Sequence, residues 1–264
     1  MLPPVLDPAC RCAPHDGRAF LRVSGPDRHD FLQGLVTQDM ARVARDGIAY
    51  GALLTPQGKL VADFLLVDQG ESGVVLDLPE GWVDDILNRL TLYKLRARVT
   101  LTQEPGTVTR GVGPAPNGAL ADPRSAALGW RLYGHALGQG VEPDWTELRI
   151  AHLIPESGLE AVPGESFILE LGFERLHGVD FRKGCYVGQE VTARMHHKTD
   201  LRRGLFVVRL TQPVPPGTAV TLEDGREAGA VYSQSGCDGL ALLRHDRANG
   251  ALRAGDAVVT VVGK

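Results

Sequence analysis

The stretch KGCYVGQE, residues 183–190, determines more of the prediction for this chain than any other segment. It sets Cys185 beside Lys183 and between Gly184 and Gly188, just before residues that are predicted to start a helix. Glycine lets the backbone bend sharply or approach a ligand closely. A nearby cation or helix N-terminus favours the thiolate, which is the reactive form of cysteine. The pattern therefore predicts a positioned thiol, and the alternative is a turn around a buried, inert cysteine.

The other polar and aromatic residues of this octapeptide each have two possible roles. Gln189 and Glu190 are placed to cap the first turn of the helix or to hold the loop by hydrogen bonds. Glu190 is a poor general base, because one carboxylate without a visible partner is more often structural. Tyr186 can stack on a planar ligand or pack in the core.

Length and composition predict a soluble globular protein. The chain has 264 residues, of which 43% are hydrophobic and 23% charged, and a net charge of −4. These values leave room for two modest domains and give no general attraction to nucleic acid or anionic membranes. No apolar run approaches the roughly 20 residues that span a bilayer, and the first residues do not resemble a secretory signal. We therefore expect no membrane partner, and a cytoplasmic location in a bacterium or a matrix location in a mitochondrion.

The four cysteines do not have the spacing of a disulfide framework. Cys10 and Cys12 lie in residues 1–17, which we expect to be a mobile N-terminal segment where both cysteines are incidental. A metal clip is the weaker alternative, because no second paired motif supports it. Cys237 lies in a predicted turn and is also expected to be incidental.

Apolar periodicity predicts a mixed α+β region over residues 18–200 and a small antiparallel β-barrel over residues 201–264. Ser24 and Asp27 have the spacing of an N-cap and a capping box. The other elements expected in the first region are strands at 18–23, 47–54, 59–67, 74–78 and 98–101, helices over 82–90 and after 143–144, and a loop or linker over 111–129. In the second region, short apolar runs alternate with glycine and proline turns. No glycine motif typical of nucleotide binding is present.

The octapeptide resembles the signature of the YgfZ family of folate-binding proteins. These are relatives of the aminomethyltransferase (T-protein) of the glycine cleavage system, and they include mitochondrial iron–sulfur assembly factors. The resemblance covers residues 18–264, and its further blocks follow in the family's order at residues 24–27, 31–39, 54–59 with Asp63, 92–99 and 149–156. It implies a ring of T-protein-like folate-binding α+β subdomains around a central hole, followed by the barrel.

The resemblance implies a tetrahydrofolate-binding accessory protein that supports assembly or repair of iron–sulfur enzymes, tRNA-modifying ones among them, with Cys185 as the working thiol. Its partners would be folate and iron–sulfur proteins or their assembly machinery. The alternative is a folate-dependent aminomethyl or one-carbon transferase of the T-protein type. A third, weaker alternative is an RNA-binding module, which the absence of clustered aromatic residues disfavours.

Asp63 and Arg149 are predicted folate contacts on the same grounds. Asp63 corresponds to an acidic position that related aminomethyltransferases use near the folate nitrogens, unless it is a strand-end aspartate on the solvent face. The family comparison also reveals two departures from the T-protein pattern. T-proteins show two successive acids where this chain has Ala62 and Asp63, and a pterin-binding glutamate where it has Ala151. Both departures favour the accessory role over one-carbon transfer.

Arg194 lies in a locally basic segment, residues 182–203. This segment has six Lys or Arg residues and two acidic residues, or +4, within a chain of net charge −4. Such a reversal favours an anionic partner, for example a glutamyl tail of folate, a phosphate or an RNA backbone, and the alternative is a solvated helix face. We predict that Arg194 binds the folate tail. The adjacent His196 and His197 point in different directions on a helix, so we predict no metal site.

Overall fold

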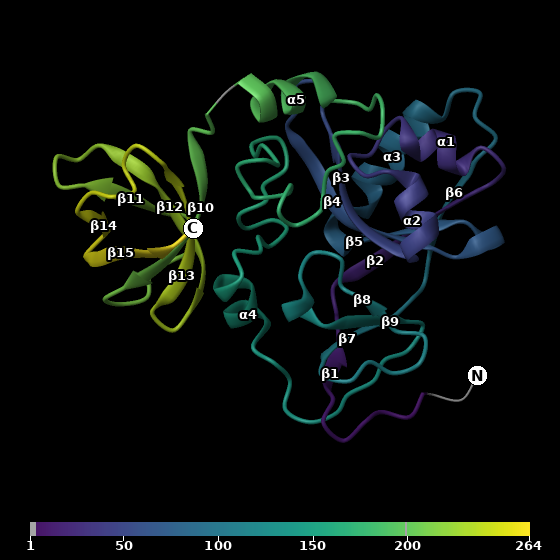
Figure 1. Ribbon diagram of the computed structural model, residues 1–264, viewed down its shortest axis with the longest axis horizontal. Coiled ribbons are helices and arrows are strands. Elements are labelled where there is room, and N and C mark those ends of the chain that lie inside the picture. The colour runs from purple at the N-terminus through teal and green to yellow at the C-terminus, as the bar shows by residue number, and fades with distance from the viewer. Residues whose placement is uncertain (1–3, 199) are drawn as a thin grey trace. The chain divides into compact units, whose positions relative to one another are not determined.

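The computed structural model describes residues 4–198 and 200–264 (Figure 1). The chain divides into two compact units, and each unit is assembled from three separate stretches. Unit 1 comprises Met1–Leu54, Val61–Pro143 and Leu176–Val187, and unit 2 comprises Thr55–Leu60, Asp144–Arg175 and Gly188–Lys264. The predicted division near residue 200 stays a prediction.

Unit 1 is built around a five-stranded sheet with the order β3-β4-β5-β2-β6. Its strands are β2 (Arg18–Ser24), β3 (Ile48–Leu54), β4 (Leu60–Asp68), β5 (Val74–Pro79) and β6 (Thr100–Glu104). β2 pairs antiparallel with β5 and with β6, and β6 is an edge strand. The first four strands confirm the sequence prediction. β6 begins two residues later than expected, because the backbone N–H groups of Arg98 and Val99 bond to Asp27 and Ala97 instead of to a strand.

Three helices pack on one face of this sheet. They are α1 (Arg28–Gln33), α2 (Met40–Asp46) and α3 (Val83–Lys94). α3 buries Val83, Ile86 and Leu90, which recur at helical spacing as predicted. These side chains share one core with alternate residues of the strands, such as Leu21 and Val23 of β2.

The capping box predicted at Ser24 is wrong. Asp27 occupies the N-cap of α1 and makes no capping hydrogen bond. Its carboxylate instead accepts hydrogen bonds from the backbone N–H and the guanidinium of Arg98. A contact between residues far apart in sequence therefore overrides the local pattern. α2, by contrast, is capped locally, because the side chain of Asp39 accepts from the N–H of Ala41.

A second sheet of unit 1 corrects two further expectations. It has the order β1-β7-β9-β8, with β1 (Arg11–Pro14), β7 (Val108–Val112), β8 (Leu120–Ala121) and β9 (Trp130–Tyr133). β1 lies in the segment that we expected to be mobile, yet it pairs with β7, and Cys10 and Cys12 are buried against Trp130. The predicted linker over 111–129 likewise contributes the end of β7 and all of β8. Burial of the large Trp130 ring gives both segments a reason to be ordered.

Unit 2 contains α4 (Trp145–Ala151) and α5 (Gln189–Lys198). Asp144 caps α4, which begins after Pro143 as predicted. α5 follows Gly188 directly, also as predicted. Among the described residues, three short 3-10 turns add to these helices, all of them in unit 1: η1 (Gly70–Ser72), η2 (Glu80–Trp82) and η3 (Ala126–Leu128).

The C-terminal part of unit 2 is a closed six-stranded antiparallel barrel (Figure 1). Its strands are β10 (Arg203–Leu210), β11 (Thr218–Leu222), β12 (Glu227–Ser235), β13 (Asp238–Arg244), β14 (Leu252–Ala254) and β15 (Ala257–Gly263). The predicted barrel is therefore confirmed, and only the three-residue β14 was too short for the sequence pattern to reveal. Within the described ranges, no helix has both the length and the apolarity needed to cross a bilayer.

Candidate functional site

Cys185 lies on a loop of unit 1 that leads into α5, and its side chain is exposed. Gly184 before it has φ +92°, and Gly188 after it has φ +84°. Both values fall in the left-handed region that favours glycine, so the two glycines are needed for the path of this loop. The predicted alternative of a buried cysteine does not hold. Cys237, the other exposed cysteine, lies in the turn between β12 and β13, as expected.

Lys183 ties this loop to the end of α1 by hydrogen bonds. Its side chain is buried, and its Nζ donates to the carbonyl oxygens of Gln33 at 2.6 Å and Val36 at 2.5 Å. The amide of Gln33 donates in return to the carbonyl of Lys183 at 2.9 Å. The end of a helix carries unsatisfied carbonyls and partial negative charge, so the lysine satisfies the end of α1. Burial lowers the pKa of Lys183 to about 8.

The remaining residues of the octapeptide separate into buried and exposed ones. Tyr186 is buried, and the Nζ of Lys183 lies 5.0 Å from its ring centroid, which matches the packing alternative. Glu190 is exposed in the first turn of α5, and Gln189 is half-buried beside it. The hydroxyl of Thr192 donates to the carbonyl of Gly188 at 3.1 Å and so holds the start of the helix.

Asp63 is buried on β4 and not on a solvent face. Its carboxylate accepts a hydrogen bond of 2.9 Å from the hydroxyl of Tyr50 on β3. Burial, together with the charge of Asp63, raises the pKa of Tyr50 well above its ordinary value, so this phenol keeps its proton. The pair therefore forms a buried donor–acceptor couple in the five-stranded sheet.

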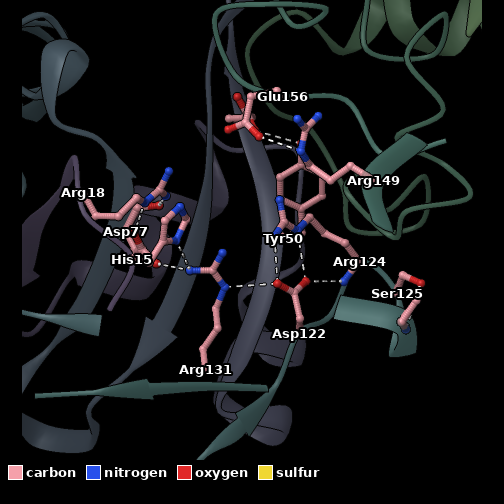
Figure 2. A network of polar contacts seen from close by, with 12 residues as sticks. His15, Arg18, Tyr50, Asp77, Asp122, Arg124, Ser125, Arg131, Arg149 and Glu156 are labelled. Atoms are coloured by element: carbon pink, nitrogen blue, oxygen red, sulfur yellow. Dashed lines mark hydrogen bonds and ion pairs between the residues drawn. The ribbon is translucent and has the colours of Figure 1, made fainter. Parts of the chain in front are cut away.

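A chain of buried ion pairs joins the two sheets of unit 1, and the sequence did not predict it (Figure 2). Arg131 of β9 lies between two carboxylates, with its Nη1 3.2 Å from Asp77 and its Nε 3.0 Å from Asp122. Arg18 binds the other side of Asp77 at 2.6 Å, and Arg124 binds Asp122 at 2.7 Å. Burial alone would raise the pKa of Asp122, but the guanidiniums of Arg124 and Arg131 hold it below its ordinary range. The sequence feature that could have indicated these ion pairs is an acid in β5 and an arginine in β9, each within an otherwise apolar strand.

Two aromatic groups complete this chain of ion pairs. The hydroxyl of Tyr133 donates to Asp77 at 2.8 Å. The guanidinium of Arg124 lies 5.6 Å from the ring centroid of Tyr50, within the range of a cation–π contact. The charges thus reach the ring whose hydroxyl binds Asp63. His15 lies among these arginines, and burial together with Arg131 lowers its pKa so far that the imidazole is neutral.

The two predicted arginines lie in unit 2, whereas Asp63 lies in unit 1. Arg149 of α4 is buried, and its Nε forms an ion pair of 2.8 Å with Glu156 (Figure 2). Its Nη1 also lies 3.3 Å from the hydroxyl of Ser233 on β12. Arg194 is exposed on α5. Arg149 therefore holds the segment before the barrel together, while Arg194 is available to solvent.

Comparison with a solved structure defines the class of fold. The aminomethyltransferase T of the glycine cleavage system from Bartonella henselae matches 97% of this chain and 85% of its own, with a TM-score of 0.76 and 14% sequence identity. Residues 202–263 match the family described as CAF17, C-terminal beta-barrel domain. The chain therefore has an aminomethyltransferase T-like fold that ends in a closed antiparallel barrel, as the resemblance implied.

Comparison with curated proteins defines the family. The human protein named iron–sulfur cluster assembly factor IBA57, mitochondrial, is 32% identical over 94% of this chain and 82% of its own length. The mouse protein of the same name is 33% identical over 92% of this chain and 80% of its own. A homologue from the fungus Phaeosphaeria nodorum is 27% identical over 88% of this chain and 70% of its own. The chain belongs to the IBA57 family.

Proposed function

We propose that this protein is a tetrahydrofolate-binding accessory factor of the YgfZ type that supports assembly or repair of iron–sulfur enzymes through the thiol of Cys185. The observation that carries the proposal is an exposed thiol on a loop that a buried lysine ties to the end of α1. The names of the curated relatives, which are iron–sulfur cluster assembly factors, support the same function.

A single working cysteine limits what the protein does with a cluster. Iron–sulfur clusters usually take four protein ligands, and Cys185 supplies one. Its partners are therefore iron–sulfur proteins or assembly machinery that bring the other ligands, tRNA-modifying enzymes among the clients. The relatives named above are mitochondrial, so we propose the mitochondrial matrix for a eukaryotic protein and the cytoplasm for a bacterial one.

The described residues fit a folate in part. Asp63 offers a buried carboxylate already oriented by Tyr50, which suits the amino groups of a pterin. Arg194 is an exposed cation that suits the glutamyl tail of folate. Arg149 fits less well as a direct contact, because Glu156 and Ser233 already bind its guanidinium. When bound, tetrahydrofolate would supply a reduced pterin that carries one-carbon units.

The first test replaces each exposed cysteine in turn. Cys185→Ala is expected to leave folding intact and to abolish support of iron–sulfur enzymes, measured as their activity in cells that lack the wild-type protein. Cys237→Ala is the matched control, because this cysteine is also exposed but lies in a barrel turn, and it is expected to keep full activity. A fully active Cys185→Ala strain would contradict the role of the thiol.

The folate part of the proposal has a separate measurement. Calorimetry with tetrahydrofolate on the wild type, Cys185→Ala and Asp63→Asn is expected to give equal binding for the first two proteins and at least tenfold weaker binding for the third. Absence of binding by the wild type would remove folate from the proposal and leave a thiol-based function. Release of a one-carbon product from an aminomethyl substrate would favour the T-protein type of transferase instead.

A further inference from the structure

The C-terminal end of α3 exposes three large apolar side chains within four residues. Leu92 is 76% exposed, Tyr93 39% and Leu95 89%. The buried face of α3 ends at Leu90, so Leu92 lies off the side that packs on the sheet. We call residues 92–96 the α3 corner. A contiguous group of exposed apolar side chains is more typical of an interaction site than of an ordinary surface.

Leu95 holds a backbone conformation that leucine rarely adopts. Its φ is +42° and its ψ is −107°. The N–H of Ala97 donates to the carbonyl of Lys94 at 2.8 Å, which closes a four-residue turn with Leu95 at the position where type II′ turns favour glycine. Glycine would adopt this conformation without strain. Because the leucine side chain is almost fully exposed, it contributes little to the core, and its presence at a strained position points to a role outside the chain.

The turn is held rigidly on its C-terminal side. The backbone N–H of Arg98 donates to Asp27 at 2.8 Å, and its guanidinium pairs with the same carboxylate at 2.8 Å. Val99 is buried. A Cβ on Gly25 would lie 2.3 Å from the carbonyl oxygen of Arg98, so the two backbone segments are in close contact. The apolar side chains of the α3 corner are therefore presented by a fixed backbone.

The surroundings of the α3 corner are basic. Within the ranges that the structure describes, Arg89, Lys94 and Arg96 form no ion pair, whereas Asp27 is neutralised by Arg98 and Glu104 by Arg22. The sequence continues directly into β6, which pairs with β2 on one side and forms the edge of the sheet on the other. β6 is mostly exposed and carries no Lys or Pro that would block pairing with another strand.

We propose that the α3 corner and the free edge of β6 together form a docking surface for an extended acidic segment of a partner protein. The segment adds to β6 as a further strand, its apolar side chains cover Leu92 and Leu95, and its carboxylates face Lys94 and Arg96. An edge strand offers backbone N–H and C=O groups that only another polypeptide satisfies, which favours a protein over a lipid surface. This surface uses neither Cys185 nor Asp63, so it is independent of the thiol and of folate.

The decisive variant is Leu95→Gly, because strain and docking predict opposite effects for it. Glycine relieves the turn, so the melting temperature of the variant is expected to equal or exceed that of the wild type. Loss of the side chain is expected to weaken binding of the partner at least tenfold. Arg96→Glu is expected to weaken binding by a similar factor at low salt and by a smaller factor at high salt, because salt screens the charge interaction. Unchanged affinity for Leu95→Gly would overturn the proposal.

A photo-crosslinking amino acid at Leu92 identifies the partner in living cells of the source organism. Val141 is the matched control position, since it is 81% exposed and lies outside the surface. The expected result is an adduct at position 92 and not at 141, with a partner peptide of net negative charge, lost in Leu95→Gly and Arg96→Glu. The captured protein, once purified, is the ligand for the affinity measurements. An adduct with lipid, with a second copy of this chain or with a neutral or basic peptide would each overturn the proposal, as would no adduct.

Discussion

Lys183 is the residue whose role changes most between sequence and structure. As a neighbour of Cys185, it was expected to act as a cation beside the thiol. Its Nζ instead reaches the carbonyls of Gln33 and Val36, about 150 positions earlier in the chain. No local pattern contains that information, because the acceptors belong to a helix end that only tertiary folding brings near. A positioned thiol was predicted from the two glycines around Cys185, since glycine adopts the left-handed backbone conformations that this loop needs.

The burial of Lys183 has a consequence that alkaline titration can detect. Its pKa is about 8 in the folded protein, whereas the pKa of a lysine in an unfolded chain is about 10.4. Between these values the unfolded state binds more protons than the folded state, so the free energy of unfolding rises with pH. The stability gained when the buried lysine becomes neutral is lost as pH falls through about 8. The free energy of unfolding of the wild type relative to Lys183→Met is expected to grow by about 2 kcal/mol from pH 7 to pH 10.

Urea unfolding at pH 7, 8, 9 and 10 measures this difference. Lys264→Met is the control, since the residue lies at the exposed end of the chain, and its difference from the wild type is expected to stay constant. A difference for Lys183→Met that does not change with pH would contradict the assignment.

At the scale of elements, most strands and helices followed from apolar periodicity and turn residues. The exceptions have physical reasons. β1 was missed because residues 11–14 have no alternation of their own and gain their order from β7 and Trp130. The cap of α1 was misplaced because Asp27 binds Arg98 instead of its own helix. In each case a partner distant in sequence overrides the local signal.

The packing of β1 gives a prediction about Cys12. This side chain is 2% exposed and packs against Trp130. Cys12→Ser places a hydroxyl in that apolar cluster and is expected to lower the free energy of unfolding by about 1–3 kcal/mol. Cys237→Ser, in an exposed turn, is expected to change it by less than about 0.5 kcal/mol. Equal values in urea unfolding would mean that the N-terminal segment is as loose as the sequence first indicated.

At the scale of the whole molecule, the chain of ion pairs is what the sequence could least predict. Its members come from separate strands and loops of both sheets in unit 1, and each charge is acceptable in the interior only because its neighbours are present. Two members, Asp77 and Arg131, interrupt apolar strands. Such a pattern indicates a buried charge, but it does not show which residue pairs with that charge. The class of fold and the barrel, by contrast, were predicted correctly, since they depend on the order of many elements.

Removing the central arginine tests this interdependence. Arg131→Met leaves the carboxylates of Asp77 and Asp122 buried with one partner fewer each, and is expected to lower the free energy of unfolding by about 3–5 kcal/mol. Arg45→Met is the control, because the pair of Arg45 with Asp46 is largely exposed, and a much smaller loss of stability is expected for it than for Arg131→Met. A loss of similar size in both variants would show that the buried chain contributes no more than a surface pair.

The division of the chain into interleaved stretches also affects its synthesis. Unit 1 lacks its last stretch, Leu176–Val187, until the ribosome has passed through Asp144–Arg175, which belongs to the other unit. At roughly 5–20 residues per second, the sheets formed from the first 143 residues wait several seconds for that stretch. During this time the carbonyls at the end of α1 lack their hydrogen bonds from Lys183, and the loop that bears Cys185 has not yet packed against them. Cys185 is thus added after the sheets of unit 1 have formed, and a nascent chain that stalls in this interval carries those sheets without the proposed working thiol.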